Sequence, residues 1–208
     1  MILEAERCQL VLVDYQERLL KHIDQNASVL GQAVLLAQAA RAFGVPVHLT
    51  EQSPESLGAT VAPLQALCPR PLIKTSFDAC ADGLLDALTP ATKPAVGGNA
   101  RSLPKHLRKA VPETKAARDI VVLAGLEAHI CVLQTALGLV EQEIEVWLVT
   151  DASGACQSRQ KDAALDRMAS QGVELVTAEM VAYEWLGSSD HPQFESMLGW
   201  VKAARSAG

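Results

Sequence analysis

Aromatic residues are scarce in this 208-residue chain: they make up 4% of it, whereas hydrophobic residues of all kinds make up 49%. The core of a single domain of this length must therefore be built from Leu, Val, Ile and Ala. No apolar run approaches the roughly 20 residues that a membrane-spanning helix needs. The N-terminal residues, with acidic Glu4 and Glu6, match neither a secretory signal nor an Arg-rich transit peptide. We therefore expect a cytoplasmic protein with no membrane partner; organellar import by a non-standard signal is the alternative.

Paired cysteines are absent as well. The chain has five cysteines, an odd number, and no C-x-x-C motif. Neither a zinc knuckle nor a thioredoxin-type motif is therefore available, and unpaired thiols suit a reducing compartment. Positive charge is also in deficit, with a net charge of −6 and a pI near 5.4. This balance argues against nucleic acid as the main partner without excluding it.

Short apolar runs rich in Val, Leu and Ile are the main pattern present. Most of them are apolar on both faces, which is typical of parallel strands covered by helices on each side. Strands alternate with segments of helical period, so the sequence predicts one α/β domain over residues 1–208, built on a doubly wound parallel sheet. The expected strands are Gln9–Asp14, Val47–Thr50, Pro71–Lys74, Ile120–Ala124, Val146–Thr150 and Val173–Val176.

Helical periods lie between these strands. Apolar residues from Val29 to Ala40 form one broad stripe, and Gly44 would end that helix. A second helix is expected directly after Cys131, and a third over about Lys161–Ser170. Each would cover one face of the sheet.

Two segments, 52–69 and 89–115, lack this pattern and are expected to be irregular. The second is strongly basic, because five cations precede its first acidic residue, Glu113. These cations are Lys93, Arg101, Lys105, Arg108 and Lys109. We interpret 89–115 as an irregular basic insertion within the domain, with a short helix near 105–111.

Polar groups capable of chemistry follow three of the apolar strands. Asp14 ends the first strand, Lys74 ends the third, and Cys131 follows the fourth after the turn 125–130. In open α/β sheets the ligand crevice lies beyond these strand ends, where the strand order reverses. Taken singly, the Asp could be a cap, the Lys a solvated group and the Cys a small core residue. Their shared placement instead favours one common site.

These three side chains together permit nucleophilic catalysis. A thiol at the start of a helix meets the positive end of the helix dipole, and a neighbouring ammonium would lower the pKa of that thiol and hold a substrate oxygen. Asp14 could accept the thiol proton and later activate water. Backbone N–H groups at the same helix start could form an oxyanion hole, worth roughly 3–4 kcal/mol per donor.

Four segments carry a combined motif. They are Leu10–Gln16 (LVLVDYQ), Ile73–Phe77 (IKTSF), Ala124–Ala136 (AGLEAHICVLQTA) and Thr150–Arg159 (TDASGACQSR). Together they resemble the isochorismatase-like (cysteine hydrolase) superfamily. Residues 50–52 (TEQ) and 57–61 (LGATV) are similar to its isochorismatase domain-containing subgroup. The resemblance covers most of the chain in order, apart from 89–115.

This resemblance implies a three-layer α/β/α fold with a six-stranded sheet in the order 3-2-1-4-5-6. It implies a catalytic triad of Asp14, Lys74 and Cys131. It further implies a cis peptide bond between Leu126 and Glu127, with the backbone N–H groups of Glu127 and Cys131 as the oxyanion hole.

The same motifs suggest substrate-binding residues. Tyr15 and Gln16 follow the proposed base directly, and Phe77 lies three residues after Lys74. On the resemblance we expect all three to line the pocket, with plain core packing as an equal alternative for Phe77.

Two departures from relatives restrict the chemistry. Nicotinamidases of this superfamily carry an Asp-x-His metal motif after the second strand, where this chain has Thr50-Glu51-Gln52. We therefore expect no metal and no cofactor. Isochorismatase itself does not use the cysteine, so the presence of Cys131 favours thiol acyl transfer over vinyl-ether cleavage.

The leading hypothesis is a metal-independent cysteine hydrolase that acts on a small amide or related carbonyl compound through a thioester. A ribonuclease or RNA-associated protein is the first alternative, since the basic insertion could release counterions from RNA. A catalytically silent, oligomeric member of the family is the second. By analogy with the superfamily we expect a homo-oligomer, with the segment His191–Ala204 as a candidate contact.

Overall fold

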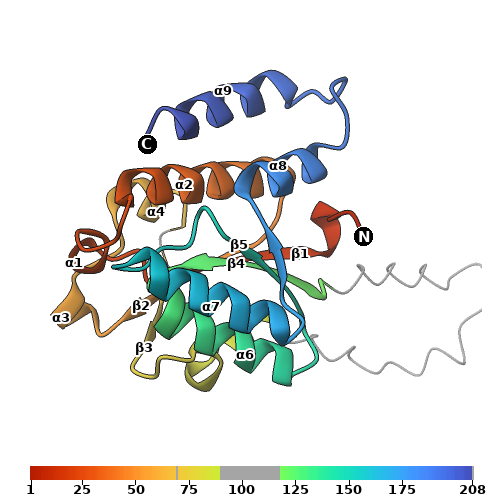
Figure 1. Ribbon diagram of the computed structural model, residues 1–208. Coiled ribbons are helices and arrows are strands. Elements are labelled where there is room, and N and C mark those ends of the chain that lie inside the picture. The colour runs from red at the N-terminus through yellow and green to blue at the C-terminus, as the bar shows by residue number, and fades with distance from the viewer. Residues whose placement is uncertain (69, 90–117, 208) are drawn as a thin grey trace, which may run out of the picture.

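The computed structural model describes residues 1–68, 70–89 and 118–207 (Figure 1). A parallel six-stranded sheet forms its centre, in the order β3-β2-β1-β4-β5-β6, which confirms the doubly wound fold. Each expected strand is present, with ends shifted by at most two residues. The strands are β1 (Cys8–Val13), β2 (Val47–Gln52), β3 (Leu72–Lys74), β4 (Ile120–Gly125), β5 (Glu145–Val149) and β6 (Glu174–Val176).

Burial explains why the central strands are apolar throughout. Every residue of β1 and β4 is buried, because helices cover both faces of the sheet at its middle. The edge strands β3 and β6 are short, and each has exposed positions. Short edge strands leave few unpaired backbone groups for another chain to pair with.

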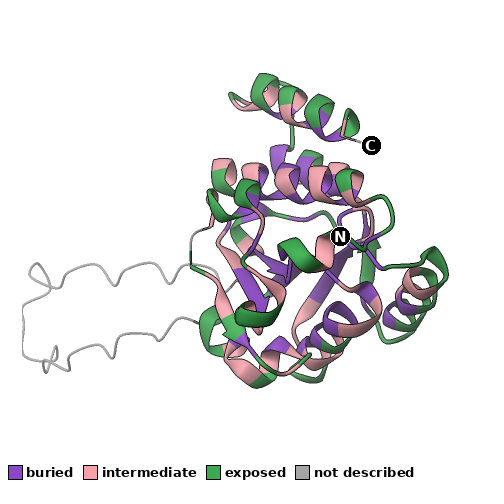
Figure 2. Cartoon of the chain, turned by 90° about the vertical axis from the view of Figure 1, so that its left-hand side faces the viewer, coloured by how far each residue is buried: buried purple, intermediate pink, exposed green. Residues whose placement is uncertain are grey.

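Helices form the two outer layers of the molecule (Figures 1 and 2). On one face, α2 (Asn26–Phe43) and α8 (Ala178–Leu186) lie against the sheet, and α9 (Phe194–Arg205) packs outside them. On the other face lie α6 (Leu133–Glu141) and α7 (Ser158–Ser170). Two hydrophobic cores result, one on each side of the sheet, and α5 (Leu84–Leu88) contributes to the second core.

The end of α2 falls at the residue that the sequence indicated. Gly44 adopts a left-handed conformation with φ of 67°, and its N–H donates to the carbonyl groups of Ala40 and Arg41. Glycine adopts this conformation without the steric cost that a Cβ would add. The chain can therefore turn directly from α2 into β2.

The expectation of an irregular segment at 52–69 is partly wrong. Two single-turn helices, α3 (Pro54–Leu57) and α4 (Ala62–Gln65), lie within it, each with a proline in its first turn. Proline is compatible with this position because its missing N–H has no intrahelical acceptor there. The other short elements are η1 (Ala5–Arg7), α1 (Glu17–Leu20) and η2 (Ala79–Asp82). The basic insertion at 89–115 and the short helix expected within it lie outside the described residues apart from Thr89.

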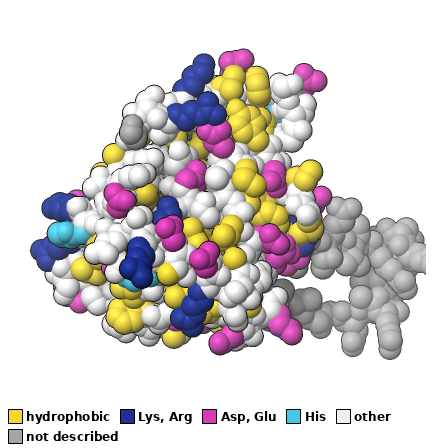
Figure 3. Space-filling view, in the orientation of Figure 1, with side chains coloured by type: hydrophobic (Ala, Val, Ile, Leu, Met, Phe, Trp, Pro, Cys, Tyr) yellow, Lys and Arg dark blue, Asp and Glu magenta, His cyan; other side chains and the backbone are white. Residues whose placement is uncertain are grey.

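On the face of the molecule shown in Figure 3, acidic and basic side chains are interspersed. Within the described ranges, no helix combines the length and apolar character needed to cross a membrane.

Candidate active site

Asp14 follows the last residue of β1 and is completely buried. Its backbone has a positive φ of 53°, a conformation that Asp tolerates better than most residues. The adjacent strand β2 holds it at two points: its N–H donates to the Thr50 carbonyl at 3.2 Å, and its Oδ1 accepts the Thr50 hydroxyl proton at 2.6 Å. These bonds leave Oδ2 as the carboxylate oxygen that faces the other groups of the site.

Lys74, the last residue of β3, is 1% exposed. Its Nζ lies 2.7 Å from Asp14 Oδ2 and donates to Gln52 Oε1 at 2.7 Å and to the Ser76 carbonyl at 3.2 Å. Nζ also donates to the Phe77 carbonyl at 3.5 Å, so four oxygens share the three protons of the ammonium. These contacts make the ammonium the counter-ion of the Asp14 carboxylate. The expectation that it also holds a substrate oxygen stays a prediction.

Cys131 lies in the π-helical turn η5 (Ala128–Val132), which leads into α6, and is 6% exposed. Burial raises the pKa of its thiol to about 12. The charge of Asp14 and a hydrogen bond to it act in the same direction, whereas Lys74 opposes them through its charge and a hydrogen bond. The structure thus brings Asp14, Lys74 and Cys131 together. The expected low pKa is wrong, because burial and the carboxylate outweigh the ammonium.

Backbone contacts fix the turn that carries the thiol. The peptide bond between Leu126 and Glu127 is cis, where the resemblance placed it. Leu126 N–H donates to the Val13 carbonyl at 2.9 Å, and Ala128 N–H donates to the Gly154 carbonyl at 2.7 Å. Glu127 N–H, between them, forms no hydrogen bond within the described part of the chain. It is therefore free to serve as one of the expected oxyanion donors.

Glycine is required where β4 meets this turn. A Cβ on Gly125 would lie 2.5 Å from the carbonyl oxygen of Val13, a distance at which the backbone would have to move. Gly125 therefore lets β4 pass close to the end of β1, so that Cys131 and Asp14 share one end of the sheet.

The expected substrate-binding residues are placed differently from one another. Tyr15 is fully buried in the first hydrophobic core, and its hydroxyl donates to the Ala152 carbonyl at 2.5 Å. Gln16 is also buried, and within the described residues its amide bonds to backbone groups of Gln52 and Gly58. Phe77 is 51% exposed. Of the three side chains, Phe77 is thus the one that a substrate could reach without displacing core packing.

Two residues of the site, Thr50 and Gln52, were not identified from the sequence. They alternate along β2 and so point to the same face, toward Asp14 and Lys74. Glu51 points to the other face and accepts hydrogen bonds from the backbone and hydroxyl of Thr60, both at 2.7 Å. The alternation of side-chain direction at the end of a strand beside Asp14 was the sequence signal that could have identified Thr50 and Gln52.

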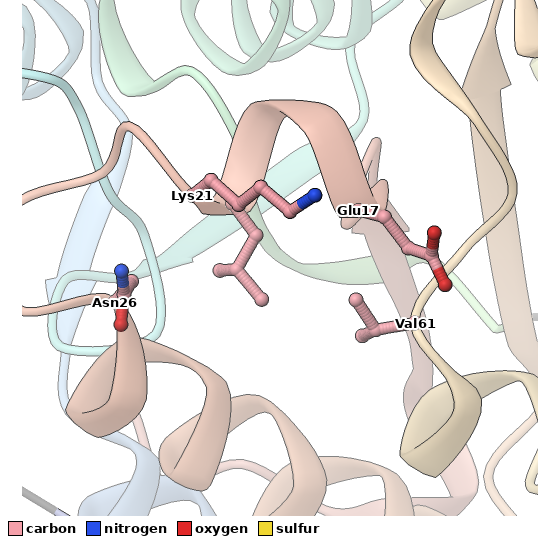
Figure 4. Close-up of a pocket in the computed structure, with 5 residues that line it drawn as sticks. Glu17, Lys21, Asn26 and Val61 are labelled. Carbon is pink, nitrogen blue, oxygen red and sulfur yellow. The ribbon is translucent and has the colours of Figure 1, made fainter.

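A hollow of the surface lies apart from this cluster. It has a volume of about 460 Å³ and is found beside α1, with Glu17, Lys21, Asn26 and Val61 on its wall (Figure 4). None of the three clustered side chains lines it. Within the described ranges, no group of three or more His, Cys, Asp or Glu side chains is arranged to hold a metal ion.

Comparison with known proteins gives a consistent result. The Isochorismatase domain model matches residues 8–180. Isochorismatase domain-containing protein 2 of Pongo abelii is 33% identical over 193 residues, which cover 93% of this chain and 82% of the relative. Isochorismatase family protein 2A of Dictyostelium discoideum is 28% identical, over 94% of this chain and 90% of the relative. The solved structure of MAR1 ribonuclease from Caenorhabditis elegans superposes with a TM-score of 0.79 at 27% identity, covering 97% and 93% of the two chains.

Proposed function

This chain belongs to the isochorismatase family, and on that premise we propose that it is a metal-independent cysteine hydrolase. Its substrate is a small amide or related carbonyl compound, which it cleaves through a thioester on Cys131. Family membership supports the hydrolase. The thioester mechanism rests on one observation: the buried Asp14–Lys74 ion pair, 2.7 Å between Oδ2 and Nζ, acts directly on the Cys131 thiol.

In the acylation step, the sulfur of Cys131 attacks the substrate carbonyl carbon while the thiol proton passes to Asp14 Oδ2. The resulting oxyanion is held by the backbone N–H groups of Glu127 and Cys131. Collapse of this intermediate breaks the C–N bond, and the leaving amine takes the proton from Asp14. The acyl group is left on sulfur as a thioester.

In the deacylation step, Asp14 accepts a proton from a water molecule that attacks the thioester carbonyl. The same N–H groups hold the second oxyanion. The C–S bond then breaks, the acid product leaves, and the sulfur recovers its proton from Asp14. Lys74 balances the carboxylate charge in both steps.

A neutral resting thiol is compatible with this mechanism. With a pKa of about 12, Cys131 carries its proton at neutral pH, so attack has to be coupled to proton transfer. The charge of Asp14 acts on the thiol, and its carboxylate can take the proton as the C–S bond forms.

An active ester tests the thioester directly. Purified protein is mixed with p-nitrophenyl acetate, and the release of p-nitrophenol is followed together with peptide mass spectrometry. We expect a burst of p-nitrophenol and an acetyl group on the peptide that carries Cys131. Cys131→Ser and Cys131→Ala should lose both, and a panel of small amides, monitored for released amine, then defines the substrate class.

Cys156 supplies the matched control. Its thiol is exposed and bonds to Glu127 Oε1 at 2.8 Å, so it is more accessible to a reagent than Cys131. Cys156→Ala should retain the burst. Acetyl groups confined to Cys156 and lysines, with no burst that depends on Cys131, would rule out the proposed mechanism.

A ribonuclease is the second candidate, because the Caenorhabditis elegans protein of similar structure is described as MAR1 ribonuclease. A thiol paired with a carboxylate is better suited to an acyl carbonyl than to a phosphodiester. Degradation of a labelled RNA that co-purifies with the protein and is lost in Cys131→Ala would support this candidate. Nuclease activity that Cys131→Ala retains, but further purification removes, would identify a contaminant.

We also propose a homo-oligomer in a reducing compartment such as the cytoplasm. All five cysteines are free thiols, which supports the compartment. In α9, Met197 packs into the core of its own chain, whereas Leu198 and Trp200 are only partly buried. A subunit contact through α9 would therefore use these last two residues, and light scattering of Trp200→Glu tests it.

A further inference from the structure

We infer that Gln52 is a positioning residue for the ammonium of Lys74, and that Gln16 holds Gln52 in place. The inference concerns the proposed thiol chemistry and rests on it. Neither glutamine is assigned as a catalytic residue, since each acts on the reacting groups through another side chain.

Gln52 connects to Lys74 in two ways. It ends β2 directly opposite Lys74 in the register of the β2–β3 pair. Its Oε1 accepts a proton from Lys74 Nζ at 2.7 Å, and its Nε2 donates to the Thr75 carbonyl at 2.7 Å. A flipped amide would place N–H groups against the ammonium, so these contacts define which way the amide lies. The buried amide thus fixes the ammonium and the backbone that follows it.

Gln16 holds the backbone of Gln52 from the other side. Its Oε1 accepts from Gln52 N–H at 2.8 Å, and its Nε2 donates to the Gln52 carbonyl at 3.1 Å. The same Nε2 donates to the Gly58 carbonyl at 2.6 Å. β1 ends at Val13, so the side chain of Gln16 continues the hydrogen bonding between β1 and β2 beyond the end of the strand.

Gln52 affects the Cys131 thiol through its own charge and through the ammonium proton of Lys74 that it accepts. Gln52 is a neutral acceptor, so it occupies one ammonium proton without adding charge. That proton is then not available to the sulfur of Cys131, whose pKa the ammonium lowers. A carboxylate at position 52 would add negative charge and disfavour the thiolate. An apolar side chain there would release the proton toward the sulfur and favour the thiolate.

Two nearly isosteric substitutions should therefore have opposite effects. We measure the rate at which iodoacetamide labels Cys131 in the full-length protein from pH 7 to pH 10, by peptide mass spectrometry. Gln52→Glu should displace the pH profile upward by about one pH unit, which is about tenfold slower labelling at a given pH. Gln52→Met should displace the profile downward. A residue that merely supports the fold would change both rates in the same direction.

Gln9 provides the control. It is another buried glutamine and lies in β1, with Nε2 bonded to the carbonyl groups of Leu88 and Arg118 and Oε1 paired with His48 Nε2. Gln9→Glu and Gln9→Met should leave the labelling profile of Cys131 unchanged. Gln16→Met should shift the profile in the direction of Gln52→Met, and the double variant should show no additional shift, because Gln16 acts through Gln52.

The outcomes separate this inference from the proposed function. If wild-type Cys131 takes no acetyl group from p-nitrophenyl acetate, the proposed hydrolase is wrong. If Cys131 is acylated but both Gln52 variants shift its labelling profile in the same direction, or by no more than the Gln9 controls, the inference is wrong. Circular dichroism shows which variants fold. If Gln52→Glu does not fold, the direction of the shift in Gln52→Met decides alone.

Discussion

The carboxylate of Asp14 and the ammonium of Lys74 face each other at the end of the sheet, with 2.7 Å between Oδ2 and Nζ and neither side chain exposed. Asp14 directly follows β1 and Lys74 ends β3, and these two strands are separated by β2. Thr50 and Gln52 of β2 each bond to one of them. A buried ion pair of this kind is costly to desolvate, so breaking it and removing it should have different effects on stability.

Lys74→Met should destabilise the protein strongly. It leaves the Asp14 carboxylate buried without its counter-ion, for which we expect a loss of about 3–5 kcal/mol in the free energy of unfolding. The double variant Asp14→Asn/Lys74→Met removes both charges and should recover more than half of that loss. Urea unfolding at pH 7 measures both. A single variant that loses less than about 1 kcal/mol would show that the pair is not buried in solution.

Asp14→Asn should separate thiol reactivity from catalysis. The carboxylate raises the pKa of the Cys131 thiol, so its removal should increase iodoacetamide labelling of Cys131 at pH 8, about tenfold for each unit by which the thiol pKa falls. Turnover of p-nitrophenyl acetate should fall, because the proton acceptor is lost. Asp86→Asn, at an exposed position of α5, is the control and should change neither rate. Slower labelling together with slower turnover would argue against this role for Asp14.

The sequence predicted the sheet and the approach of Asp14 to Lys74 for a clear physical reason. Parallel strands end at one edge, so polar residues that end the first and third apolar runs must lie near each other once the strand order is known. Asp14 and Lys74 fulfil this condition. The same rule extends to β2, whose alternation places Thr50 and Gln52 on the face of the site. The residue types at positions 50–52 show that the metal motif is missing. The alternation along the strand is a separate signal, which indicates the side chains that face the site.

Other features could not be predicted from strand periodicity. The chain leaves the extended conformation at Asp14, with φ of 53°, so the alternation of faces does not continue to Tyr15 and Gln16. Both side chains are buried, and their expected place in the pocket stays a prediction. The pKa of Cys131 depends on burial, which is a property of the packed fold, and a motif does not reveal it.

Tyr15→Phe tests whether this side chain belongs to the core. The substitution keeps the buried ring but removes the hydroxyl that donates to the Ala152 carbonyl. We expect a loss of about 1–3 kcal/mol in the free energy of unfolding, because a buried carbonyl loses its donor. The KM for p-nitrophenyl acetate should stay unchanged. Tyr183→Phe, at an exposed position of α8, should change neither quantity, and a raised KM in Tyr15→Phe would instead place the hydroxyl in the pocket.

Raised thiol pKa values should make the fold sensitive to alkali. An unfolded cysteine loses its proton near pH 9, whereas the pKa of Cys131 in the native protein is about 12 and that of Cys8 is about 11. Between these limits the native state holds more protons than the unfolded state, so the free energy of unfolding must fall as pH rises. The stabilisation by a neutral thiol is complete below pH 9 and is lost as pH rises through the native pKa.

Cys131→Ala isolates the contribution of one thiol. Each such thiol contributes at most about 1.4 kcal/mol per pH unit to the decline in stability. Cys131→Ala should make the decline of the free energy of unfolding between pH 9 and pH 11 shallower by up to this amount. This expectation does not depend on how the substitution changes the free energy of unfolding at neutral pH. Urea unfolding at half-unit intervals of pH gives the slope. Cys156→Ala, which removes an exposed thiol, should change the slope less than Cys131→Ala does, because the hydrogen bond to Glu127 raises the pKa of Cys156 less than burial raises that of Cys131. Equal slopes in wild type and Cys131→Ala would mean that the Cys131 thiol is not desolvated as the structure indicates.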